Sequence, residues 1–141
     1  MIENANKGML WEAINCLIVD DDKFSRTFMK TALHQIGIKI VREAVDVEEA
    51  REILADFKVD VILLDQQMPG KTGLDFAREL KLHHEAGDKE IPIIMVTVDT
   101  KEKTVLDAKN IGIQEYLVKP ISPSALKKRL CTAFGIKQER V

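Results

Sequence analysis

The sequence predicts an α/β fold of the (βα)5 type, a doubly wound sheet of five parallel strands with helices on both faces. Short apolar segments of strand length alternate along the chain with segments whose apolar residues recur every three or four positions. Three of the strand segments are almost continuously apolar, which is typical of strands covered on both faces. The 141 residues, 45% of them apolar, suffice for one domain with a single core.

Five segments rich in apolar and β-branched residues are predicted as strands. They cover residues 16–20, 39–45, 59–65, 91–97 and 116–119. Because a helical segment follows each strand, we expect parallel strands joined by right-handed crossovers. The carboxyl ends of all five strands should therefore lie at one edge of the sheet.

Five helices are predicted from apolar stripes with helical spacing. The stripe of the first helix, which we expect to face the core and to end at Gly37, comprises Phe24, Phe28, Ala32, Leu33 and Ile36. The other stripes lie within residues 47–57, 74–82, 105–111 and 126–134. Asp46 and Ser122 are placed as N-caps of the second and fifth helices. For the first helix both Asp22 and Ser25 qualify as the cap.

We expect one domain over residues 16–136, an N-terminal extension over 1–15 and a C-terminal tail over 137–141. In the extension, an amphipathic turn can form from Met9, Leu10, Ala13 and Ile14. Such a turn either packs locally on the domain or serves self-association.

Composition excludes several classes of protein. A net charge of -2 and a pI near 5.9 give no reason to expect direct nucleic-acid binding. No apolar run approaches the roughly 18 residues of a membrane span, and the first residues lack the layout of a signal peptide, so we expect no membrane insertion. Two isolated cysteines are typical of a reducing compartment, and we expect a cytoplasmic protein.

Polar side chains follow the apolar strands at the edge where ligands bind in such folds. The first strand ends in Asp20, Asp21 and Asp22, and the third ends in Asp65. The fourth strand ends in Thr97 and the fifth in Lys119, which is followed by Pro120. Carboxylates, a hydroxyl and an ammonium are thus expected to converge on one rim.

This set of groups predicts a site for a metal ion and a phosphoryl group. Neighbouring carboxylates raise one another's pKa unless a cation intervenes. An all-oxygen donor set favours a hard ion such as Mg²⁺, which keeps part of its water shell. A lysine ammonium and a threonine hydroxyl can bind phosphoryl oxygens, and a carboxylate can itself act as the nucleophile and form an acyl phosphate.

Four stretches of the sequence carry a family resemblance. VDDDK, VDVILLDQQMPGKTGLDF, PIIMVT and GIQEYLVKP together resemble the receiver domain of bacterial two-component response regulators, of the chemotaxis-regulator-like single-domain type. The likeness covers residues 16 to about 136, and its most specific motif is D-x-x-M-P-G-x-x-G. It implies the flavodoxin-like strand order 2-1-3-4-5.

The resemblance implies a role for each rim residue. Asp65 corresponds to the phosphorylated aspartate. Mg²⁺ would be held by Asp20, Asp21 and Asp65, with the main-chain carbonyl of Gln67 as a further ligand.

Three further positions follow from the same likeness. Thr97 and Lys119 would contact the phosphoryl oxygens, and a cis Lys119–Pro120 bond would aim the lysine into the site. Tyr116 corresponds to an aromatic residue that changes rotamer on activation, together with Thr97.

The function implied is a phosphoacceptor switch rather than an enzyme acting on separate substrates, with only self-catalysed phosphotransfer and autodephosphorylation. Its phosphodonor would be a sensor histidine kinase or a histidine phosphotransfer protein, and its output a downstream target protein. One departure from the family pattern is Val98, where a smaller residue is usual. A branched side chain there could narrow access to Asp65.

Two other classes of function remain open from the sequence. Asp20-x-Asp22 fits the spacing of a haloacid-dehalogenase-type phosphatase with Asp20 as nucleophile, but Phe24 and Ser25 do not fit the rest of that motif. The chain also leaves no room for a substrate cap. A phosphorylation-independent interaction module is the other alternative, and the complete set of rim residues argues against it.

Overall fold

The computed structural model describes residues 11–82, 90–113 and 115–136, and in this range the chain forms a five-stranded parallel sheet. The strands are β1 (Asn15–Val19), β2 (Ile40–Ala44), β3 (Val61–Leu64), β4 (Ile93–Thr97) and β5 (Glu115–Val118). Their order is β2-β1-β3-β4-β5, and every neighbouring pair is parallel. The predicted fold class and strand order are confirmed.

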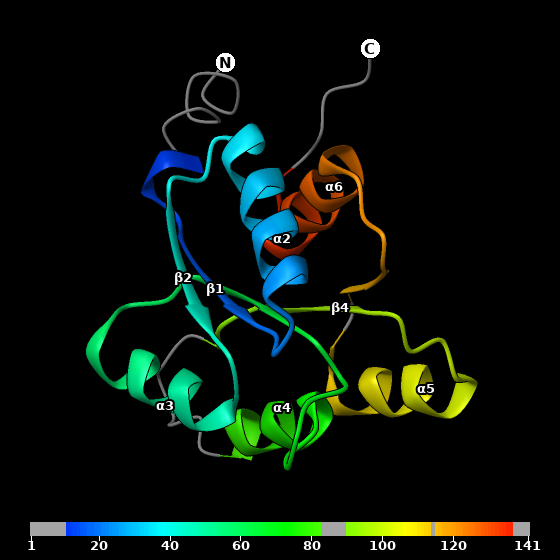
Figure 1. The fold of residues 1–141 in the computed structure, drawn as a ribbon. Coiled ribbons are helices and arrows are strands. Elements are labelled where there is room, and N and C mark those ends of the chain that lie inside the picture. Colours follow the sequence, from blue (N-terminus) through cyan, green and yellow to red (C-terminus); the bar gives the residue numbers. More distant parts are fainter. Residues whose placement is uncertain (1–10, 83–89, 114, 137–141) are drawn as a thin grey trace.

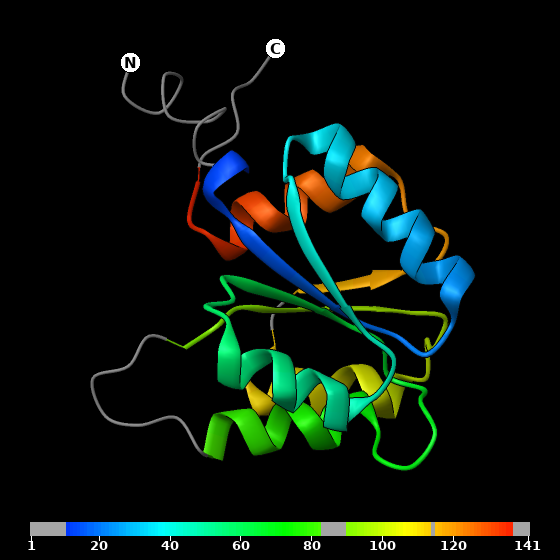
Figure 2. The ribbon, with the colours of Figure 1, turned by 60° about the vertical axis from the view of Figure 1, so that its left-hand side comes forward.

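Helices cover both faces of this sheet. They are α2 (Lys23–Ile36), α3 (Val47–Asp56), α4 (Gly73–Leu82), α5 (Glu102–Ile111) and α6 (Pro123–Ala133). Helices α2 and α6 lie together on one face, and α3, α4 and α5 lie on the other (Figures 1 and 2). Within the described ranges, no helix has the length and apolar character needed to cross a membrane.

The sheet supplies one half of each of two apolar cores. Side chains alternate along a strand, so in β1 Ile18 packs toward α2 and α6, whereas Leu17 packs toward α3 and α4. All four residues of β3 are fully buried, as the continuous apolar pattern predicts. A fully buried central strand therefore leads directly to Asp65.

The predicted helix caps are present. Asp22 accepts a hydrogen bond from the Ser25 amide at 3.1 Å, so the structure selects Asp22 as the cap of α2. Asp46 and Ser122 cap α3 and α6 in the same way. Asp22 is thereby separated in role from the two aspartates that precede it.

The apolar stripe predicted for the first helix is only partly correct. The buried residues of α2 are Met29, Ala32 and Leu33, whereas Phe24 is 79% exposed and Phe28 is 46% exposed. Phe24 stands in the first turn of α2, past the end of β1, where the sheet offers no apolar surface to pack against. Both rings are left at the surface.

Part of the predicted N-terminal extension packs on the domain. Trp11 and Ile14 are buried in the core beneath α2, and the Trp11 Cβ lies close to Gly37. Ala13 is exposed, and Met9 and Leu10 lie outside the described residues. The predicted tail 137–141 also lies outside them, and the division of the chain at residue 16 stays a prediction.

Candidate functional site

Main-chain hydrogen bonds align the ends of four strands into one rim. The Asp65 amide donates to the Val19 carbonyl at 3.0 Å, which brings the residues after β1 and β3 side by side. The Lys119 amide donates to the Thr97 carbonyl at 2.9 Å and does the same for β4 and β5. Backbone pairing therefore places the predicted carboxylate, hydroxyl and ammonium groups at one edge of the sheet.

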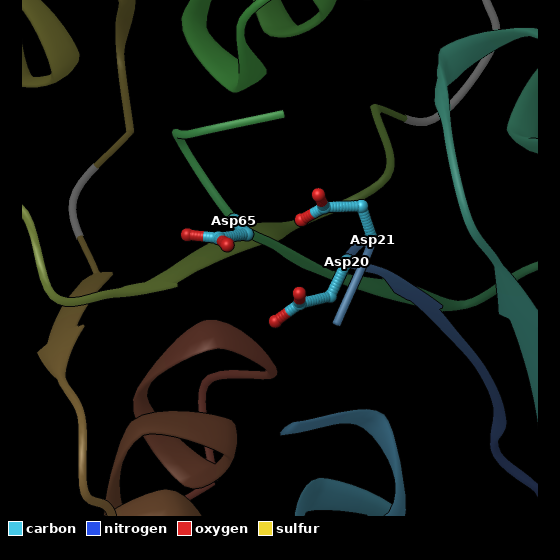
Figure 3. A group of neighbouring side chains, drawn as sticks. All are labelled: Asp20, Asp21 and Asp65. Carbon is cyan, nitrogen blue, oxygen red and sulfur yellow. The ribbon is translucent and has the colours of Figure 1, made fainter. Parts of the chain in front are cut away.

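Three carboxylates form a cluster at this rim. Asp20, Asp21 and Asp65 each offer an oxygen, and these oxygens lie within 4.8 Å of one another (Figure 3). Asp20 and Asp65 are buried, while Asp21 is exposed. The donor set fits Mg²⁺, because it consists of carboxylate oxygens only and its exposed member leaves room for water ligands.

Lys119 balances part of this negative charge. Its Nζ lies 2.6 Å from Asp20 Oδ2 and 3.3 Å from Asp65 Oδ2. Burial lowers the pKa of the Lys119 ammonium, but the hydrogen bond to Asp20 and the charges of both aspartates outweigh it, and the net pKa is raised. One ammonium facing three carboxylates leaves a net negative charge that a divalent cation can offset.

The surroundings of Asp65 contain groups that favour its neutral form and groups that favour its ionised form. Burial raises the pKa of its carboxyl group, and the charge of Asp20 acts in the same direction. The hydrogen bond from Thr97 and the charge of Lys119 lower this pKa without cancelling the increase. Its Oδ1 also accepts the Gln66 amide at 2.8 Å, so the side chain is fixed in direction.

A chain of hydrogen bonds leads away from Asp65 toward α5. The fully buried Thr97 hydroxyl bonds to Asp65, and its oxygen accepts the Asp99 amide at 3.2 Å. The Tyr116 hydroxyl donates to the Asp99 carbonyl at 2.7 Å. The Asp99 carboxylate accepts the Lys101 amide at the start of α5. Asp65 is thus connected to Tyr116 and to the start of α5 through two residues, Thr97 and Asp99.

The predicted metal ligand Gln67 and the predicted cis bond can also be placed. Gln67 is exposed and lines, with Asp21 and Asp99, an open hollow of about 470 Å³ beside the carboxylate cluster. The Lys119–Pro120 peptide bond is cis, as predicted. All seven predicted site residues therefore lie at or beside the rim.

Comparison with known proteins agrees with this geometry. Residues 16–131 match the family described as the response regulator receiver domain. The chain belongs to this family. Receiver domains are the phosphoacceptor domains of two-component signalling, and membership of the family assigns this general role to the chain.

Relatives of known name support the same assignment. The receiver domain is 37% identical over 120 residues to chemotaxis protein CheY1 of Helicobacter pylori, covering 84% of this chain and 95% of that protein. It is 38% identical over 114 residues to the phosphate regulon transcriptional regulatory protein PhoB of Pseudomonas aeruginosa. That match covers 81% of this chain but only 48% of PhoB, so the chain spans about half of that relative.

Solved structures show the same fold. CheY4 of Vibrio cholerae superposes with a TM-score of 0.75 at 31% identity, covering 85% of this chain and 98% of that one. A chain of the CheX-CheY-BeF3-Mg²⁺ complex from Borrelia burgdorferi gives a TM-score of 0.73 at 27% identity, covering 86% and 89% of the two chains.

Gly73 and Arg26 also contact the backbone of the site, and neither was predicted from the sequence as a site residue. A Cβ atom added to Gly73 would lie 2.1 Å from the main-chain oxygen of Asp65, so only glycine fits there. Gly73 is the last residue of the D-x-x-M-P-G-x-x-G motif, which was the available signal. Arg26 donates to the Asp20 carbonyl at 2.9 Å, and no local sequence pattern indicates that contact.

An apolar hollow of about 310 Å³ adjoins Lys119 on the α2 side of the receiver domain. The exposed side chains of Phe24, Phe28 and Val98 line it, together with Ile121. The two phenylalanines also line a second hollow of about 290 Å³, which continues along α2 to Pro123 at the start of α6. The Lys119 end of the carboxylate cluster is therefore flanked by a continuous apolar surface.

Proposed function

We propose that this receiver domain accepts a phosphoryl group on Asp65 from a phosphohistidine of a sensor histidine kinase or a histidine phosphotransfer protein. The observation that carries the proposal is the convergence of Asp65 with the Lys119 ammonium and the Thr97 hydroxyl. A nucleophile, a cation and a hydrogen-bond donor then surround the position of the incoming phosphorus.

The chemical step is a transfer between two nucleophiles. An Asp65 carboxylate oxygen attacks the phosphorus and forms the O–P bond of an acyl phosphate. The N–P bond of the donor breaks, its electron pair stays on the ring nitrogen, and the imidazole leaves neutral because its other nitrogen carries a proton. Lys119 and Thr97 donate to the phosphoryl oxygens during the transfer.

The metal site in this proposal consists of Asp20, Asp21, Asp65 and the main-chain carbonyl of Gln67. Mg²⁺ bound there would supply positive charge to the phosphoryl oxygens. The carboxylate cluster and its residual negative charge support this assignment. Further support comes from the related CheX-CheY-BeF3-Mg²⁺ complex of Borrelia burgdorferi, in which Mg²⁺ and BeF3 are present.

In this proposal, phosphorylation changes the surface formed by α5 and β5. A downstream target protein binds the changed surface. A phosphoryl group on Asp65 competes for the Thr97 hydroxyl, which now bonds to Asp65 and accepts the Asp99 amide. Because Tyr116 is bonded to the Asp99 carbonyl, a shift of Asp99 is passed to Tyr116. Thr97 and Tyr116 are the switch residues in this scheme.

The phosphodonor protein is proposed to dock on the apolar surface formed by Phe24, Phe28 and Val98. This surface borders Lys119, so a partner bound there can bring a histidine to Asp65. Exposed aromatic side chains are frequent anchors of protein interfaces. With such partners we place the receiver domain in the cytoplasm.

The alternative of a phosphatase with Asp20 as nucleophile has less support. Asp20 is fully buried, its Oδ1 accepts the Asp22 amide at 2.9 Å and its Oδ2 is bonded to Lys119. Both oxygens therefore have partners in the interior. A phosphorylation-independent module would have no use for the cluster of three carboxylates.

The test is acetyl phosphate with Mg²⁺, followed by intact mass spectrometry and peptide mapping. Wild type should gain one phosphoryl group on Asp65, and Asp65→Asn should gain none. Asp22→Asn is the matched control, since it removes a neighbouring carboxylate outside the site and should label normally. Label on Asp20, or label that survives Asp65→Asn, would contradict the proposal.

A further inference from the structure

Arg26 lies behind the carboxylate cluster and contacts two elements at once. It stands in the second turn of α2, and its side chain is only 12% exposed. Its Nη1 donates to the main-chain carbonyl of Asp20 at 2.9 Å, and its Nε donates to Glu43 Oε1 at 3.2 Å. The guanidinium thus joins α2, the end of β1 and strand β2.

The carbonyl that Arg26 binds belongs to the peptide unit between Asp20 and Asp21. The Asp20 amide donates to the Ala44 carbonyl at 3.0 Å, which fixes the near side of Asp20 to β2. The bond from Arg26 fixes its far side. The orientation of the peptide that carries Asp21 is therefore set by a backbone hydrogen bond on one side and by the Arg26 side chain on the other.

Asp21 depends on that orientation more than the other two carboxylates do. Asp20 and Asp65 have side-chain hydrogen bonds with Lys119. Among the described residues, the exposed Asp21 carboxylate has no recorded hydrogen bond or ion pair, although its oxygen lies within 4.8 Å of the others. Its direction follows from the main chain alone.

Glu43 in turn holds the guanidinium in place. It lies in β2, paired in register with Ile18 of β1, so its position is fixed by the sheet. Its other oxygen accepts Lys30 Nζ at 3.3 Å. Because the arginine fork offers several donors in fixed directions, it can serve the carboxylate and the carbonyl together, which an ammonium cannot do in the same geometry.

We infer that Arg26, held by Glu43, is a positioning residue for the Mg²⁺ site and keeps the Asp21 carboxylate within reach of Asp20 and Asp65. This inference rests on the metal site of the proposed function. Partners that orient metal ligands typically change metal affinity about tenfold or more when they are removed.

The test is titration of the unphosphorylated full chain with Mg²⁺ by isothermal calorimetry, comparing Arg26→Gln with Lys30→Gln. Both variants remove one positive charge next to Glu43, so they alter the field at the site in the same sense. Of these two residues, Arg26 alone is hydrogen-bonded to Asp20. We expect Arg26→Gln to bind Mg²⁺ about tenfold more weakly than Lys30→Gln, at a temperature where circular dichroism shows both variants folded.

Equal affinities of Arg26→Gln and Lys30→Gln overturn the inference. If Arg26→Gln does not fold, Arg26→Lys decides, since it keeps the charge but loses the fork. We expect Arg26→Lys to bind Mg²⁺ more weakly than wild type by a factor of about three or more. Wild-type affinity of this variant would overturn the inference. A wild-type chain that binds no Mg²⁺ contradicts the proposed metal site itself, so the two failures are distinguishable.

Discussion

Lys119 Nζ lies 2.6 Å from Oδ2 of Asp20, a carboxylate with no exposed surface. The two residues are 99 positions apart in the chain, and their contact closes the site from β1 to β5. A buried carboxylate without a cation is costly, so this pair ties the stability of the domain to the composition of its site.

Replacing Lys119 with methionine should therefore destabilise the receiver domain and stop its phosphorylation. Loss of one partner of a buried pair costs about 3–5 kcal/mol in the free energy of unfolding. Mg²⁺ should restore part of this loss, because it supplies positive charge to the same carboxylates. Urea unfolding in EDTA and in Mg²⁺ measures both effects.

Lys101→Met is the control for this prediction. Lys101 Nζ lies 3.8 Å from Asp99, but its side chain is 74% exposed, so its removal should change the stability little. Equal losses for the two variants would show that the Lys119 pair has no special weight.

Asp65→Asn should stabilise the metal-free domain at neutral pH. The pKa of Asp65 is raised in the folded state, chiefly by burial, so the folded chain holds this proton more tightly than the unfolded chain does. The resulting stabilisation is complete below the unfolded-state pKa, near 3.8, and is lost as the pH rises through the higher folded-state value. At pH 7 the ionised carboxylate thus opposes folding, and asparagine removes that charge.

Thermal unfolding in EDTA between pH 4 and pH 7 tests this sign. The melting temperature of Asp65→Asn should exceed that of wild type at pH 7, and the difference should shrink toward pH 4. Mg²⁺ should narrow the gap at pH 7, since it stabilises the ionised wild type. A variant that is less stable than wild type at pH 7 in EDTA contradicts the prediction.

The sequence was sufficient to predict the members of the site because strand order and strand ends determine where they lie. Once five βα units are recognised, Asp20, Asp65, Thr97 and Lys119 must meet at one edge. The helix caps were equally local, since a cap such as Asp22 binds an amide three residues away.

Contacts between distant segments could not be read in the same way. The role inferred for Arg26 on α2 depends on the position of Glu43, 17 residues away on strand β2. The need for Gly73 depends on how closely α4 approaches the Asp65 carbonyl. The helical stripe assigned Phe24 and Phe28 to the core because periodicity shows which residues share a face, not how far the sheet extends beneath it.

Gly73→Ala should disrupt the site directly. The added Cβ would stand 2.1 Å from the Asp65 main-chain oxygen, and a backbone atom cannot yield as a flexible side chain can. We expect a loss of at least about 3 kcal/mol in the free energy of unfolding, the upper range for overpacking, and slower phosphorylation by acetyl phosphate. Urea unfolding and phosphorylation kinetics measure the two effects.

Gly70→Ala is its matched control, three residues earlier in the loop that precedes α4. Gly70 has a φ of 81°, but its Cβ would meet nothing within 4 Å. Its cost should be only that of a left-handed alanine, about 1–2 kcal/mol. If Gly73→Ala proves no more damaging than Gly70→Ala, the close approach at Asp65 has no energetic weight.

Phe24→Ser and Phe28→Ser should separate phosphorylation by proteins from phosphorylation by small molecules. These rings are exposed and border the site, so their loss should leave acetyl phosphate labelling and stability nearly unchanged. Transfer from a phosphorylated histidine kinase or phosphotransfer protein should slow by at least about tenfold, the effect of losing one interface contact of about 1.4 kcal/mol. The donor to use is the one that labels wild type fastest.

Leu82→Ser is the control, because Leu82 is 82% exposed but lies on α4, across the sheet from α2 (Figure 2). Unchanged transfer to both phenylalanine variants, or equal slowing by Leu82→Ser, would place the donor elsewhere on the domain.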